Sequence, residues 1–203
     1  SRKVKEYEID LSSQDVFGLA GVILVRNLIN SNLRLSSLNI SNNEIGATDL
    51  FPLLTGTESM FLRNLDLSRN DFDVEVVSLI SNFIQRNYNL EAINLSYNAL
   101  YDIQSLLKVL AENNKLKKLG MNSISLDVNG LEGLMKFLVN DKVLEEVDIG
   151  SELIDDGFLA LIREIIEGEN KIKKLILTNS KISKVALLQL KNMGIEKGVT
   201  IEF

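Results

Sequence analysis

Apolar residues follow one spacing pattern that recurs about every 28 residues along the chain. The pattern is L-x-x-L-x-L-x-x-N-x-L, and it fits Leu35 to Ile45, Leu62 to Phe72 and Leu90 to Leu100 when isoleucine and phenylalanine are accepted at leucine positions. With four less regular copies, the starts are residues 6, 35, 62, 90, 116, 144 and 172. Self-similarity at a fixed period is typical of repeat architectures, so the pattern predicts a stack of similar units.

Each copy begins with a predicted short β-strand. Alternate strand residues point to opposite faces, so the second and third leucine positions enter the core while the residue between them faces solvent. The asparagine position follows, where the chain turns out of the strand. A buried amide there can satisfy backbone groups of the turn and of the adjacent copy. The last three copies replace it with Ile124, Glu152 and Ser180, which predicts differently bonded turns.

Helical periodicity follows each strand. Apolar residues such as Val77, Ile80 and Ile84 recur at spacings of three and four, which predicts amphipathic helices. Short hydrogen-bond acceptors suited to helix N-caps precede these stretches: Asp73, Asp102, Asp127, Asp155 and Ser183. Pro52 predicts a short or broken helix from Ala47 to Leu54. A closing strand is expected at residues 199–203.

A strand followed by a full helix at this period resembles the helical branch of the leucine-rich repeats. Leu62 to Phe72 and Leu90 to Leu100 resemble ribonuclease-inhibitor-type repeats, which also occur in the tropomodulin C-terminal domain, the Ran GTPase-activating protein and immune sensors. The resemblance covers Glu6 to Phe203. It implies an α/β solenoid, a curved right-handed horseshoe with a parallel sheet on the concave face and helices on the convex face. We expect one domain over residues 1–203, and the missing initiator methionine suggests part of a longer protein.

Composition narrows the possible functions. The chain has no cysteine and no histidine, which excludes thiol nucleophiles, Cys/His zinc sites and imidazole-based triads. Lysine and arginine total 22 against 28 acidic residues, a net charge of −6, so we expect no nucleic-acid partner. We find no glycine-rich phosphate loop, calcium loop, signal peptide or membrane segment, and expect no catalytic residue, cofactor, metal or small-molecule substrate. The absence of cysteine favours a cytoplasmic protein.

The exposed strand position defines the concave face through Asp10, Asn39, Asp66, Asn94, Gly120, Asp148 and Ile176. Arg69 and Tyr97 stand side by side just beyond the strands of adjacent copies, and Tyr101 follows on the same rim. The candidate partner-binding residues are Arg69, Tyr97, Tyr101, Asp66, Asn94 and Asn39. A tyrosine that merely stacks on an arginine of the same protein is the alternative for the pair. Tyr88, Phe51 and Phe61, near loops or helix ends, are expected to be buried between repeats.

Charges of alternating sign mark another strand position, occupied by Arg63, Glu91, Lys117, Glu145 and Lys173. Neighbours in a parallel ladder lie about 4.8 Å apart, so we expect ion pairs that fix the register rather than a docking patch.

The sequence therefore predicts a non-enzymatic module that binds a protein partner through its concave face or rim. Two alternatives stay open at this stage: a GTPase-activating or cytoskeletal-regulator module, and a structural spacer or oligomerisation unit.

Overall fold

The structure, a computed structural model, describes residues 7–15, 18–31, 34–55 and 61–203. Its strands form one eight-stranded parallel sheet in which the order in space follows the order in sequence. The strands are β1 Tyr7–Asp10, β2 Leu35–Asn39, β3 Asn64–Asp66, β4 Ala92–Asn94, β5 Lys118–Gly120, β6 Glu146–Asp148, β7 Lys174–Ile176 and β8 Thr200–Glu202.

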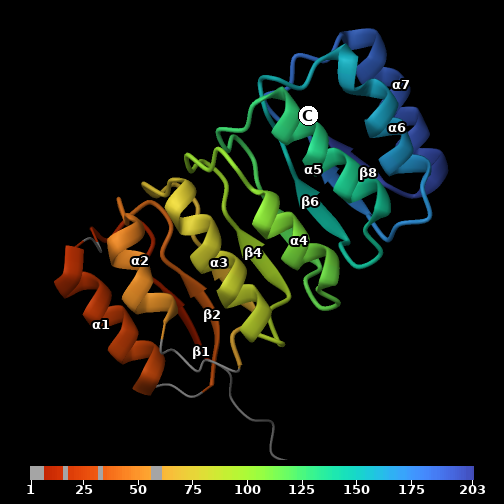
Figure 1. Cartoon of the computed structure of the whole chain (residues 1–203). Helices are drawn as coiled ribbons and strands as arrows, with labels where there is room; N and C mark the ends of the chain where they lie inside the picture. Colours follow the sequence, from red (N-terminus) through yellow and green to blue (C-terminus); the bar gives the residue numbers. More distant parts are fainter. Residues whose placement is uncertain (1–6, 16–17, 32–33, 56–60) are drawn as a thin grey trace, which may run out of the picture.

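Helices connect successive strands and lie side by side on one face of the sheet, from α1 at one end to α7 at the other (Figure 1). They are α1 Gly18–Ser31, α2 Ala47–Leu54, α3 Val74–Arg86, α4 Gln104–Glu112, α5 Val128–Asn140, α6 Leu159–Glu167 and α7 Lys184–Lys197. The expected solenoid, with seven strand–helix units and a closing strand, is confirmed. In the part of the chain that the structure describes, no helix is both long and apolar enough to span a bilayer.

The core lies between the sheet and the helices. Leu65, Ile93 and Leu119 occupy the same inward-facing strand position in consecutive units and are in register with one another. All three are almost fully buried, as are Ile80 and Leu106 from the helices above them. Each unit therefore buries its apolar face against the preceding and following units, which is why the repeat period sets the fold.

Buried asparagines join the turns of the first four units. The side chain of Asn98 donates through Nδ2 to the carbonyl oxygens of Leu67 at 3.1 Å and Leu95 at 2.9 Å. Its Oδ1 accepts from the backbone N–H groups of Asn70 at 3.1 Å and Phe72 at 3.3 Å. Asn70 and Asn43 repeat this arrangement one and two units earlier. The predicted role of the asparagine position is confirmed.

The later turns are bonded differently, as expected from the loss of asparagine. Asn122, two residues before the position that Ile124 fills, donates through Nδ2 to Asp148 Oδ1 at 2.9 Å and to Thr178 Oγ1 at 2.6 Å. The latter bond joins residues two units apart and passes over Gly150. A Cβ atom at Gly150 would lie 2.6 Å from Asn122 Nδ2, so no side chain fits beneath this bridge.

Most helix starts agree with the sequence prediction. The side chains of Asp73, Asp127 and Ser183 accept hydrogen bonds from first-turn N–H groups of α3, α5 and α7. Asp155 caps a 3₁₀ turn, Asp156–Phe158, that leads into α6. Asp102 is a correction: it accepts from the N–H of Gln104, but Ile103 lies between it and α4 and is the N-cap residue.

The predicted short helix around Pro52 is α2. The expected burial of Tyr88, Phe51 and Phe61 is wrong, because all three are exposed. Phe51 lies within α2, Phe61 shortly before β3, and Tyr88 just after α3.

Candidate interaction surface

The sheet face opposite the helices carries an open groove of about 410 Å³. We call it the concave groove. Outward-facing residues from β2 to β7 line it, among them Asn39, Asp66 and Asn94, together with Ala92 and Gly120. Three of the predicted partner-binding residues therefore meet on one surface, where they occupy the same register position in adjacent strands. The groove is open and extends across the strands from β2 to β7.

Acidic and amide side chains alternate along this register position. Asp66 Oδ2 accepts from Asn94 Nδ2 at 3.1 Å, and Asp66 Oδ1 accepts from the N–H of Ser68 at 2.9 Å. Asn39 and Asn94 in turn accept from the backbone two residues later. These hydrogen bonds hold the three side chains in place along the concave groove.

Gly120 interrupts this row and allows Asn94 to lean over β5. A Cβ atom at residue 120 would lie 2.9 Å from Asn94 Cγ, so a side chain there would displace the Asn94 amide. Beyond it, burial raises the pKa of Asp148 above its ordinary value, and hydrogen bonds from Asn122 and Gly150 only partly oppose this. Asp148 makes no ion pair with a described residue and lines the groove. Burial therefore disfavours its charged form, which a nearby cation would stabilise.

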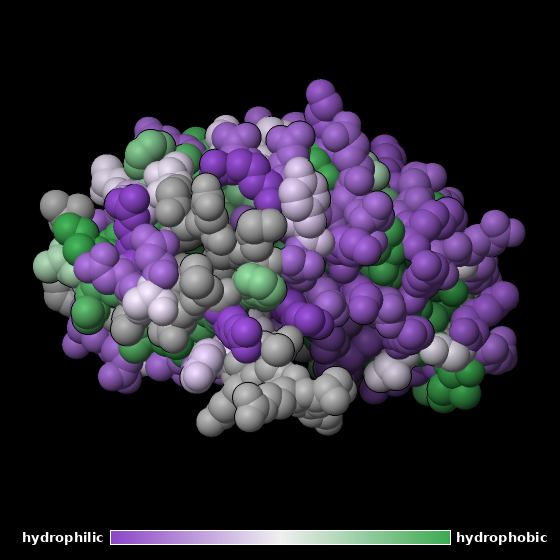
Figure 2. All heavy atoms as spheres, turned by 90° about the horizontal axis from the view of Figure 1, so that it is seen from below, coloured by the Kyte–Doolittle hydropathy of each residue, from purple (hydrophilic) through white to green (hydrophobic). Residues whose placement is uncertain are grey.

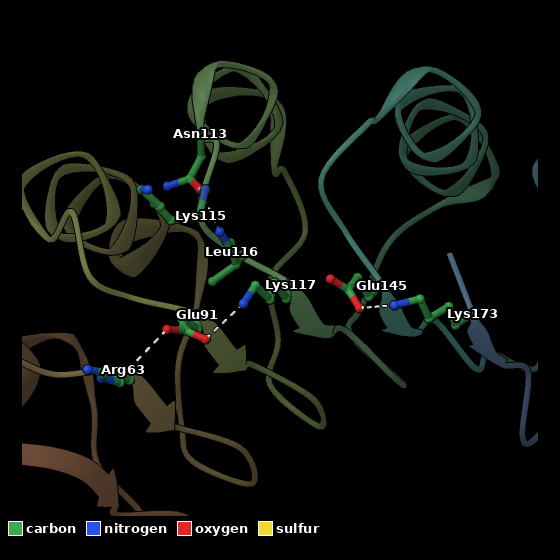
Figure 3. A network of polar contacts seen from close by, with 8 residues as sticks. All are labelled: Arg63, Glu91, Asn113, Lys115, Leu116, Lys117, Glu145 and Lys173. Carbon is green, nitrogen blue, oxygen red and sulfur yellow. Dashed lines mark hydrogen bonds and ion pairs between the residues drawn. The ribbon is translucent and has the colours of Figure 1, made fainter. Parts of the chain in front are cut away.

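A ladder of ion pairs runs along one margin of the concave face (Figure 3). Glu91 contacts Arg63 at 3.4 Å and Lys117 at 3.2 Å, and Glu145 contacts Lys173 at 2.6 Å. The Lys173 ammonium lowers the pKa of Glu145. The alternating charges are thus paired within the chain, as expected, and such exposed pairs contribute about 0–1 kcal/mol each.

Arg69 and Tyr97 form a stacked pair on the rim where β3 and β4 end. The guanidinium carbon of Arg69 lies 3.9 Å from the centroid of the Tyr97 ring, which is a cation–π contact. Both side chains are exposed, Tyr97 to 38%. Arg69 makes no ion pair with any residue that the structure describes. The pair is therefore stacked within the protein, as the alternative held, and is also accessible to a partner.

The backbone at this rim position is left-handed in most units. Arg69 and Tyr97 have φ angles of 55° and 59°, and Asn42, Ser123 and Asn179 adopt the same conformation in other units. Asparagine tolerates φ > 0, whereas a bulky side chain there costs on the order of 1 kcal/mol or more. Arg69 and Tyr97 therefore make this turn less stable than asparagine would.

A second hollow, of about 520 Å³, lies beside Tyr97 on the rim. The turns of three units line it, through Asp71 and Asp73, Tyr97 and Ala99, and Ser123. Tyr101 is 60% exposed, but it lines neither this hollow nor the concave groove. The structure thus divides the predicted residues into three parts: the groove set of Asn39, Asp66 and Asn94, the rim pair of Arg69 and Tyr97, and Tyr101 by itself.

Sequence reasoning missed the left-handed backbone of the rim pair and the role of Asn122. The left-handed backbone could have been predicted, since asparagine and serine occupy the same position in other copies. The role of Asn122 could not have been predicted, because its hydrogen bond over Gly150 joins two units that are not neighbours in the sequence.

Comparison with known proteins gives likenesses to both curated sequences and solved structures. No protein-family model matches the chain. It is 27% identical over 142 residues to the mouse protein NACHT, LRR and PYD domains-containing protein 14, a match that covers 68% of this chain and 14% of that protein. It is 27% identical over 132 residues to FERM domain-containing protein C of Dictyostelium discoideum, covering 63% of this chain and 9% of that protein. The chain thus spans a small fraction of the length of these curated relatives.

Among solved structures, an internalin (InlF) of Listeria monocytogenes superposes with a TM-score of 0.50 at 15% identity, covering 97% of this chain and 61% of that one. A likeness at this identity concerns the fold alone. The repeat in the sequence, the row of strand–helix units and these likenesses lead to one conclusion: the chain is a leucine-rich repeat protein.

Proposed function

We propose that the chain is a non-enzymatic module that binds a protein partner through the concave groove and the adjacent rim, with Arg69 and Tyr97 as the energetic centre of the contact. The observation that carries this proposal is the left-handed backbone beneath an exposed, stacked Arg–Tyr pair. Residues with a backbone conformation that is unfavourable for their side chain are commonly found at functional sites. Arginine and tyrosine are also enriched among binding hot spots.

The chemistry of the surface supports a protein partner over a substrate. The groove is open and lined by hydrogen-bonded amides and carboxylates. It also carries Asp148, a partly buried carboxylate whose charged form a cationic group of a partner would stabilise. The stacked guanidinium of Arg69 keeps its N–H edges available and loses little freedom on binding, because the Tyr97 ring already holds its plane.

The rim pair can be tested without harming the fold. The double variant Arg69→Asn/Tyr97→Asn places at both positions the residue that Asn42 and Asn179 show to be compatible with this turn. Relief of backbone strain offsets the lost cation–π contact, so stability in urea should stay within about 1 kcal/mol of wild type.

Binding should respond in the opposite way. Proteins captured from source-cell lysate by the wild-type chain are identified, and the affinity of the saturable one is measured by calorimetry. The double variant should bind it more weakly by about 2 kcal/mol or more, roughly 30-fold. The matched control is Arg86→Asn/Tyr88→Asn, which removes the same residue types at exposed sites near the end of α3. Equal binding by both double variants removes the rim pair from the interface.

The groove has its own test. Ala92→Arg fills the middle of the concave groove with a long side chain, and Ala111→Arg places the same side chain on the exposed surface of α4. We expect only Ala92→Arg to block the partner. If Ala111→Arg blocks it equally, the partner binds the convex face instead.

A further inference from the structure

Positive charge is concentrated in the last strand–helix–strand unit. Residues 171–203 contain seven lysines and two glutamates, a formal charge of +5, so that residues 1–170 carry −11 of the total of −6. The lysines are Lys171, Lys173, Lys174, Lys181, Lys184, Lys191 and Lys197. A charge asymmetry of this size creates a field that steers an acidic partner to one end of the molecule.

Some of these lysines are neutralised within the fold. Lys173, Lys174 and Lys181 pair with glutamates of the preceding unit or of β8 at 2.6–3.6 Å. The other four make no ion pair with a described residue. Three of them, Lys184, Lys191 and Lys197, lie on α7. Lys191 Nζ lies 5.6 Å from the centroid of the Phe203 ring.

Lys184 and Lys191 alternate with exposed aliphatic residues on one side of α7. Lys184, Leu188, Lys191 and Ile195 are spaced by four, three and four residues, which places them in one row along the helix. We call this row the α7 stripe. Leu188 is 62% and Ile195 78% exposed, whereas Leu190 on the opposite side is fully buried. In Figure 2 the half of the molecule with the C-terminal units is mostly hydrophilic, and hydrophobic residues are visible at several places on it, including its far end.

A hollow of about 480 Å³ adjoins the α7 stripe between α7 and β8. Lys191 and Ile195 line it together with the chain from Gly198 to Ile201. Gly198 ends α7 in the left-handed conformation, with φ of 72°, and the N–H of Val199 then donates to the carbonyl of Gly194 at 2.8 Å. This turn places β8 beside the C-terminal end of the helix.

We propose that the α7 stripe and this hollow bind an acidic amphipathic segment of a partner protein. Its aliphatic residues pack on Leu188 and Ile195, and its carboxylates pair with Lys184 and Lys191. The two lysines are seven residues apart, about 10.5 Å along the helix axis, which matches carboxylates seven residues apart on a partner helix. This surface is separate from the concave groove, where Asp66 and Asp148 give the opposite sign of charge.

The whole chain is titrated with a synthetic helical peptide of about 20 residues, with leucine at the apolar heptad positions and glutamate at the flanking ones. A second peptide carries lysine in place of glutamate. Affinity is measured by calorimetry and the contact surface by shifts of backbone amide resonances. The variants are Lys184→Glu/Lys191→Glu and Leu188→Ser/Ile195→Ser. The control, Lys108→Glu/Lys115→Glu, makes the same change of net charge at exposed sites elsewhere.

We expect the glutamate peptide to bind wild type with shifts confined to α7 and β8. Charge reversal on the α7 stripe should weaken this peptide at least about tenfold and create binding of the lysine peptide, while the control changes affinity by less than about threefold. The variant Leu188→Ser/Ile195→Ser should also bind the glutamate peptide more weakly than wild type does. Urea unfolding confirms that each variant is folded.

Several results overturn the proposal. Equal binding of the two peptides by wild type, or equal loss in the charge-reversed variant and the control, refutes recognition of acidic groups by the α7 stripe. Binding of wild type to phosphatidylserine vesicles but not to the peptide assigns the surface to membranes. Self-association lost in the serine variant assigns it to a second copy of the chain. None of these outcomes bears on Arg69 and Tyr97, so the proposed function is tested separately.

Discussion

Removal of the Asn98 side chain is the sharpest test of what holds adjacent units together. The side chain is 4% exposed, and its Oδ1 accepts hydrogen bonds from the N–H groups of Asn70 and Phe72 in the preceding unit. In Asn98→Ala both buried donors lose their partner, at about 1–3 kcal/mol each. We therefore expect the free energy of unfolding to fall by about 2–6 kcal/mol.

Urea unfolding followed by circular dichroism measures this loss, and hydrogen exchange locates it at the amides of Asn70 and Phe72. Asn98→Asp keeps an acceptor for the two N–H groups but turns the other oxygen toward the carbonyls of Leu67 and Leu95. It should destabilise strongly at neutral pH and less when the carboxyl is protonated.

Asn140→Ala is the control, because its amide donates to a carbonyl of its own helix at an exposed site. It should cost less than about 0.5 kcal/mol. A loss below 1 kcal/mol in Asn98→Ala, or unchanged protection of the two amides, would refute the assigned role of the asparagines.

Three further results are expected. Leu95→Ala removes a fully buried side chain and should cost about 2–5 kcal/mol in urea unfolding, with exchange protection lost in neighbouring units as well. Glu91→Gln breaks two exposed ion pairs and should cost less than about 1 kcal/mol, a difference that disappears at high salt. Burial raises the pKa of Asp148 above 3.8, so the wild-type protein loses stability as pH rises through the raised value and the carboxyl ionises. Asp148→Asn should be as stable as wild type well below pH 3.8 and more stable than wild type at neutral pH. Thermal melts across this pH range measure the difference.

The fold was predictable because each unit repeats the same strand–turn–helix pattern, which depends on residues close together in the sequence. The apolar spacing around Leu65 and Leu67 specifies both a strand and the face it buries, and the same frame recurs in every copy. Asp73 and Asp127 mark helix starts through a chemistry that acts within four residues. Such local signals need no knowledge of distant contacts.

The candidate surface was only partly predictable. Register alone brings Asn39, Asp66 and Asn94 together, so the groove set follows from the repeat. The pairing of Lys173 with Glu145 also follows from the register, whereas the repeat spacing does not show that Lys191 on α7 has no ion-pair partner among the described residues. Exposure of Tyr88 likewise depends on where α3 ends relative to the helix beside it.

The bridge over Gly150 extends cooperativity beyond adjacent units. Stability in repeat proteins is ordinarily a sum of unit terms and nearest-neighbour terms. Asn122 adds a second-neighbour term, because it bonds directly to Thr178 and accepts from Asn179. The final three units should therefore unfold as one block, whereas the asparagine turns before them allow fraying one unit at a time. A deletion that removes the middle unit of this block would not simply shorten the solenoid, since it would change which residues the amide of Asn122 can reach.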